Sequence, residues 1–126
     1  MPDIKVPKMS EVADIMTRGG AETLQPTAPA SLTPAQDQSV RQAVQQLFPA
    51  SWAVSLKGLD SGRKADGSLV TCGIYNASKS GGDKTLSGIF RAETDPLTAQ
   101  TVVREAAHTG GKKLAAFSNC QALDLF

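Results

Sequence analysis

Residues 69–77 read Leu-Val-Thr-Cys-Gly-Ile-Tyr-Asn-Ala, and this stretch decides the fold of the chain. It is rich in side chains that favour strands, and Val70, Cys72 and Ile74 share one face because successive side chains of a strand point to opposite sides. We therefore expect a strand from Leu69 to Tyr75.

Similar segments lie on both sides of this strand. Apolar and small or polar residues alternate over 52–57, and an apolar run returns over 86–92. The connecting segments, 60–67 and 78–84, are rich in turn-forming residues, and Asp66-Gly67 is a strong hairpin signal. Three strands joined by short turns predict an antiparallel meander.

The clearest helix signal precedes the meander, over Pro34 to about Leu47. Thr33 and Gln36 have the spacing of a capping box, and proline is well tolerated at the first helical position. Pro49 ends the pattern. The apolar residues recur at helical spacing and form one face that would cover the sheet: Val40, Ala43, Val44, Leu47 and Phe48.

After the meander, Asp95 and Pro96 have the pattern of a second helix start, and Gly110-Gly111 has the pattern of its end. Lys112 to Cys120 then reads as a last strand. The expected fold class is α+β: a small antiparallel sheet, made of the three-strand meander plus a C-terminal strand, packed with two helices. The apolar stripe of the second helix is Ala99, Val102, Val103, Ala106 and Ala107.

Residues 1–33 read as a flexible N-terminal arm, and residues 34–126 read as one domain. The arm is rich in Ala, Pro, Thr and Gly, and such a segment buries too little apolar surface to offset its ordering entropy. One short helix is expected inside it, capped by Ser10 and ended by Gly19-Gly20. Its apolar face is Met9, Val12, Ala13 and Met16.

The composition argues against several classes of partner. Thirteen basic and twelve acidic residues give a net charge of +1, which gives no electrostatic reason to expect nucleic acid. No apolar run approaches the ~20 residues that span a bilayer. The N-terminus has no signal-peptide pattern, so the protein is cytoplasmic if this N-terminus is native. A trimmed form of a periplasmic or otherwise exported protein would have the same sequence.

Candidate catalytic residues are sparse, and we predict no catalytic group, cofactor or metal. His108, the only histidine, has no evident nucleophile or carboxylate partner. The pairs Asp60/Asp66 and Glu93/Asp95 flank turns or a helix start, where acidic side chains bond the backbone. The loop 78–84 lacks the spacing of a phosphate-binding loop.

Two cysteines, Cys72 and Cys120, are far apart in the sequence and have no metal-ligand spacing. Two interpretations stay open. They are either buried thiols that pack as small apolar groups or a disulfide formed in an oxidising compartment.

A series of short motifs around Cys72 resembles a small bacterial domain of uncharacterised function, often found in lipoproteins and other exported proteins, with a hairpin of the pattern vCGxvNAkNsyGGytGxxpF. The resemblance covers roughly residues 36–92. It implies a small antiparallel sheet with a helix, a cysteine that pairs in an exported setting, and no known activity. The aromatics usual in that hairpin loop are replaced by Asp83, Lys84 and Thr85. The matching motifs, in order, are Val44 to Leu47, Pro49-Ala-Ser51, Asp66-Gly67, Cys72-Gly73, Asn76-Ala77, Gly81-Gly82, Gly88 and Phe90.

The last six residues, Gln-Ala-Leu-Asp-Leu-Phe, are similar to the peptide by which bacterial replication and repair proteins dock on the β sliding clamp. That resemblance implies that Gln121 bonds the rim of the clamp pocket, Leu123 fills a subsite, and Leu125 with Phe126 enters an apolar groove. Asp124 occupies the polar position of the motif. The alternative is that these apolar residues cover the core of their own domain.

These observations favour a non-enzymatic binding or accessory domain with a protein partner. The second hypothesis is an accessory protein that docks on the sliding clamp through its C-terminal peptide. Export of the protein would predict a bond between Cys72 and Cys120.

Overall fold

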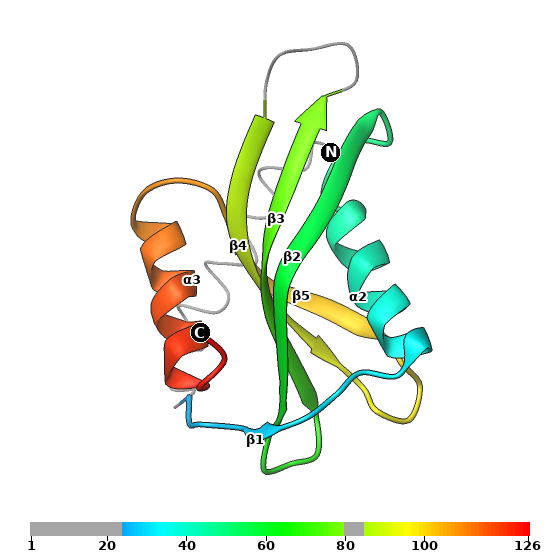
Figure 1. The fold of residues 1–126 in the computed structure, drawn as a ribbon, viewed down its shortest axis with the longest axis vertical. Helices are drawn as coiled ribbons and strands as arrows, with labels where there is room; N and C mark the ends of the chain where they lie inside the picture. Colours follow the sequence, from blue (N-terminus) through cyan, green and yellow to red (C-terminus); the bar gives the residue numbers. More distant parts are fainter. Residues whose placement is uncertain (1–23, 80–84) are drawn as a thin grey trace.

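The computed structural model describes residues 24–79 and 85–126, which form a five-stranded antiparallel sheet packed with two helices (Figure 1). The α+β fold class is therefore confirmed. The strands follow one another in the sheet in the order β1-β2-β3-β4-β5. In chain order the elements are β1 (Ala28–Pro29), α2 (Pro34–Gln45), β2 (Trp52–Arg63), β3 (Leu69–Lys79), β4 (Thr85–Thr94), β5 (Thr101–Ala107) and α3 (Gly110–Ala122).

The sheet is the middle of three layers, because α2 and α3 lie on its opposite faces (Figure 1). Side chains of β3 alternate between the two faces, as the sequence pattern predicted. The α3 side buries Val70, Cys72, Ile89, Ala116, Cys120, Leu123 and Leu125. The α2 side buries Val40, Val44, Tyr75, Ala77, Phe90 and Ala92.

The predicted start of α2 is confirmed in detail. The Gln36 backbone N–H donates to Thr33 Oγ1 at 3.2 Å, and the Thr33 N–H donates to Gln36 Oε1 at 2.9 Å. This reciprocal pair satisfies two backbone donors that a helix start leaves without partners. The helix ends at Gln45, slightly before the predicted Leu47.

The prediction of a helix after Asp95 is wrong, because this part of the chain forms a turn and then β5. Asp95 Oδ1 accepts the Leu97 N–H at 2.8 Å, and the Asp95 N–H donates to Gln100 O at 2.9 Å. Ala99 has a φ of 61° inside this turn. Asp95 therefore bonds the backbone as a turn residue and not as a helix cap.

A bulge in β5 explains why its apolar residues have helical spacing. Val103 pairs with Ala92 and Ala106 pairs with Phe90, so Arg104 is an extra residue between them. The insertion places Val103 and Ala106 on the same face although they are three residues apart. That interval mimics the spacing of one helical turn.

The predicted strand over 112–120 is also wrong, because these residues belong to α3. The buried residues Ala116, Cys120 and Leu123 are spaced by four and then three positions, which places them on one side of a helix. Gly110-Gly111 begins this helix and does not end a preceding one.

The described part of the predicted arm lies against the domain. Ala28 and Pro29 pair with Arg63 and Gly62 at the edge of β2. Leu24 packs against the buried cluster under α3. The short helix predicted after Ser10 lies outside the described residues. Neither described helix is long and apolar enough to span a membrane.

Candidate functional site

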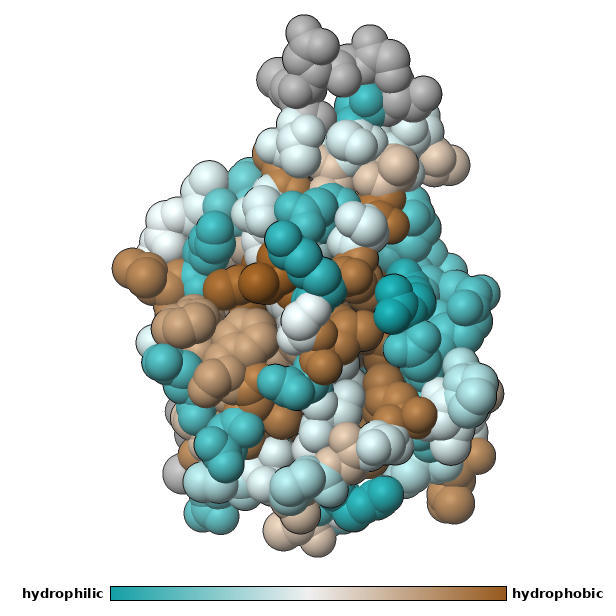
Figure 2. All heavy atoms as spheres, viewed as in Figure 1, coloured by the Kyte–Doolittle hydropathy of each residue, from teal (hydrophilic) through white to brown (hydrophobic). Residues whose placement is uncertain are grey.

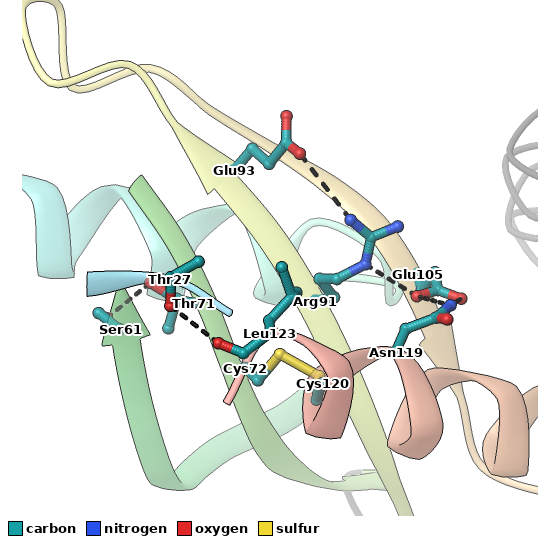
Figure 3. The surroundings of a disulfide bond; sticks show 10 residues. All are labelled: Thr27, Ser61, Thr71, Cys72, Arg91, Glu93, Glu105, Asn119, Cys120 and Leu123. Carbon is teal, nitrogen blue, oxygen red and sulfur yellow. Dashed lines mark hydrogen bonds and ion pairs between the residues drawn. A yellow bond between two sulfur atoms is a disulfide. The ribbon is translucent and has the colours of Figure 1, made fainter. Parts of the chain in front are cut away.

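A disulfide joins α3 to the centre of the sheet (Figure 3). The Sγ atoms of Cys72 and Cys120 are 2.05 Å apart, the Cα atoms are 6.1 Å apart, and both residues are fully buried. Cys72 comes from the middle of β3, and Cys120 from the last turn of α3. The bond therefore fixes the C-terminal end of the helix on the sheet.

A buried network of charges lies beside the disulfide, because Arg91 is the register partner of Cys72 in β4. Arg91 is fully buried, and its Nε donates to Glu105 Oε1 at 2.8 Å. Asn119 Nδ2 donates to both oxygens of the same carboxylate, at 2.9 and 2.8 Å (Figure 3). Glu105 therefore connects β4 and β5 to α3.

Glu93 is the second carboxylate of the network. Its oxygens lie 3.2 Å from Lys64 Nζ, 3.2 Å from Arg104 Nη2 and 3.8 Å from Arg91 Nη1. Burying a charged side chain costs free energy unless opposite charges or hydrogen bonds compensate its desolvation. Both carboxylates are bound by such partners. We therefore interpret the network as structural, holding α3 on the sheet, and not as a pair of acid–base catalysts.

The C-terminal residues are divided between the core and the surface. Leu123 and Leu125 are buried with Cys120, and the Leu125 N–H donates to Cys120 O at 2.9 Å. Gln121 and Asp124 are exposed. In this conformation the two leucines that would contact the clamp, Leu123 and Leu125, cover the core of their own domain.

An exposed apolar stripe runs along the outer side of α3, and it has no equivalent on α2. Leu114 is 70% exposed, Phe117 is 39% exposed, and Phe126 is 37% exposed. The rings of Phe117 and Phe126 are in contact, with centroids 5.7 Å apart. Figure 2 shows hydrophobic residues at the surface on the side of the molecule where α3 lies, and others over the middle of the same view. We define the α3 surface as Leu114, Phe117, Ser118, Gln121 and Phe126.

The remaining candidates from the sequence are scattered over the fold. His108 lies between β5 and α3. Asp66 Oδ1 accepts the Ser68 N–H at 2.9 Å, and this backbone hydrogen bond lowers the pKa of Asp66, as expected for a turn residue. Residues 80–84 of the polar loop lie outside the described residues. Across 24–79 and 85–126, no group of His, Cys, Asp or Glu has an arrangement that could hold a metal ion.

Comparisons with known proteins found no matching family model, no similar curated protein and no similar solved structure. The interpretation of the α3 surface therefore rests on its geometry and chemistry.

Proposed function

We propose that this chain is a non-catalytic binding domain that uses the α3 surface to dock a protein partner. The observation that carries the proposal is the exposed stripe of large apolar side chains on a helix that is fixed to the sheet. Of the five large hydrophobic residues exposed in the described part of the chain, three belong to this surface: Leu114, Phe117 and Phe126.

The two helices differ in what they present to solvent. The exposed positions of α2 include Gln38, Arg41 and Gln42, which are polar, whereas α3 presents Leu114 and Phe117. Aromatic and aliphatic anchors that become buried on binding carry most of the energy of a protein interface. A contiguous apolar stripe on one helix only is typical of an interaction surface.

The attachment of α3 to the sheet favours a role in binding, because the helix is already held in place before a partner docks. The disulfide holds its last turn, and the bonds from Asn119 to Glu105 hold it to β5. A surface that is already ordered loses less conformational entropy when a partner docks. The rigid attachment therefore leaves more of the contact energy for affinity.

The proposed compartment is an oxidising one, such as the periplasm or the cell exterior. Buried disulfides persist in oxidising compartments and are rare where thiols are kept reduced. The pairing of Cys72 with Cys120 supports this location. The resemblance to a domain of exported proteins points the same way.

Docking on a sliding clamp through the last six residues has less support from the geometry. Leu123 and Leu125 would have to leave the core, and exposing two leucine side chains costs roughly 3–6 kcal/mol before any new contact forms. The α3 surface needs no such release.

Site-specific photo-crosslinking tests the proposal in the cells that make the protein. A benzophenone side chain at Gln121 is expected to give one discrete adduct, because this position lies in the stripe. The same group at Gln42, on the polar side of α2, is the matched control and is expected to give none. The adduct must also disappear when Leu114→Asp is added. No adduct from Gln121, or equal adducts from both positions, would refute the proposal.

A further inference from the structure

We infer that the partner of the α3 surface is a second copy of this chain, whose α3 packs antiparallel against the first. This inference rests on the proposed function, and it specifies which protein docks. It follows from the distribution of charge along α3, the shape of the stripe and the symmetry that such a pair would have.

The charges of α3 are placed against its own dipole. Lys112 and Lys113 lie in the first turn, which has no acidic residue, and the last turn has no basic residue. Asp124 follows directly after the helix. A helix is positive at its N-terminus and negative at its C-terminus, so cations are unfavourable at the start and anions at the end. Within one copy these three charges are all in unfavourable positions.

An antiparallel second copy reverses this situation. It brings the end of one helix, with Asp124, beside the start of the other, where Lys113 is four positions before Phe117 and therefore borders the stripe. The two helix dipoles are then also opposed. In a two-fold arrangement each of these contacts occurs twice, so a single surface complements itself. The net charge of only +1 per chain adds little general repulsion.

The shape of the stripe suits the same arrangement. Leu114, Phe117, Ser118 and Gln121 follow the spacing i, i+3, i+4, i+7, which is one side of a helix. Ser118 is small and lies near the middle of the stripe, so two helices can approach to the ~8–10 Å typical of packed pairs. Leu114 of one copy then faces Gln121 of the other, with Phe117 beside Ser118.

The expected affinity is modest. α3 has 13 residues and is therefore about 20 Å long, and two such helices bury less than the ~800 Å² per partner of a standard interface. We expect a dimer that dissociates in the micromolar range of protein concentration. Such a dimer is visible only when concentration is varied.

Sedimentation equilibrium of the full chain with its disulfide intact, from low to high micromolar concentration, tests the inference. We expect a monomer–dimer equilibrium, and at least a tenfold weaker dimer for Leu114→Asp. Gln42→Asp is the control and is expected to leave the equilibrium unchanged. Thermal melts of both variants show whether each is folded. A monomer at every concentration, or a dimer that Leu114→Asp leaves intact, would overturn the inference.

A charge exchange tests the antiparallel direction. One variant carries Lys113→Glu, and the other carries Asp124→Lys. Each alone is expected to dimerise more weakly, because like charges meet at both ends of the helix pair. An equimolar mixture is expected to recover the dimer, since opposite charges then meet at both ends. Failure of the mixture to recover would refute the antiparallel packing.

The crosslinking experiment separates this inference from the proposed function. An adduct from Gln121 with twice the 13.2 kDa mass of the chain supports both. A discrete adduct of another mass keeps the binding function and overturns the second copy as the partner. Absence of any adduct refutes both.

Discussion

Replacing both cysteines, by Cys72→Ala together with Cys120→Ala, is expected to lower the free energy of unfolding by about 4 kcal/mol. The two cysteines are separated by 48 positions. In the chain-entropy model, a crosslink that closes a loop of this length removes about 14 cal/mol/K from the unfolded ensemble, or about 4 kcal/mol at room temperature. Alanine is the chosen replacement because both sites are fully buried and a polar side chain would add its own desolvation cost.

The loss is expected to be concentrated in α3, because the helix has few other attachments. Within it only Ala116 and Cys120 are buried, and Thr109 at its start makes no side-chain capping bond. Hydrogen exchange in the double variant should therefore accelerate more in α3 than in the central strand β3. The unmodified protein under reducing agent should behave in the same way.

Calorimetry gives the global measurement. For a domain of about 100 residues, 4 kcal/mol corresponds to a fall in Tm of roughly 15–30 °C. Ala115→Ser is the control, because it changes an exposed position of the same helix outside the α3 surface and should move Tm by no more than about 4 °C. If the double variant melted within about 5 °C of the parent, and native protein contained two free thiols by alkylation and mass spectrometry, the reasoning would be refuted.

Three further predictions follow from buried contacts. Leu125→Ala should lower the free energy of unfolding by about 2–5 kcal/mol, because Leu125 is buried. Phe126 is more exposed, so Phe126→Ala should lower it by less than about 1.5 kcal/mol. Equal small effects of both variants in urea unfolding would show that Leu125 is not part of the core. Gly88→Ala should destabilise the fold strongly, because the added Cβ would clash with a backbone oxygen and the Tyr75 ring. Gly111→Ala places its Cβ in open space and should be neutral or stabilising. A reversed order of the two Tm values would contradict this packing. Burial raises the pKa of Tyr75 to about 12 from 10.0. The stability that Tyr75 contributes is therefore complete below about pH 10 and is lost, by up to roughly 3 kcal/mol, as pH rises toward 12. Tyr75 is the only tyrosine, so absorbance titration reports it alone, and Tyr75→Phe should remove this part of the pH dependence; ionisation near pH 10 in the folded protein would refute the burial argument.

The first half of the fold was predictable because its signals are local. The capping box of Thr33 and Gln36, the alternation over 69–75 and the Asp66-Gly67 turn each act over a few residues, and each was confirmed. The chain after Thr94 was not predictable in this way: the segment expected to be a helix is β5, and the segment expected to be a strand is α3. The extra residue Arg104 gave a strand the periodicity of a helix.

The candidate site was predictable only in part. The sequence identified the two cysteines and the apolar C-terminal residues, but not whether they were paired or buried. The charge network was missed, because Arg91 and Glu105 meet through the register of β4 and β5, and Asn119 reaches them only when α3 is a helix. The exposed stripe of Leu114 and Phe117 was also missed, because these residues share one side only when α3 is a helix.

Thr27 donates through its N–H and its Oγ1 to the carbonyl of Leu123, at 3.0 and 2.9 Å (Figure 3). The first and last described parts of the fold therefore lie side by side, so the polypeptide enters and leaves at one corner. A domain with this geometry can be placed within a loop of a larger host protein while the host keeps its own path almost unchanged.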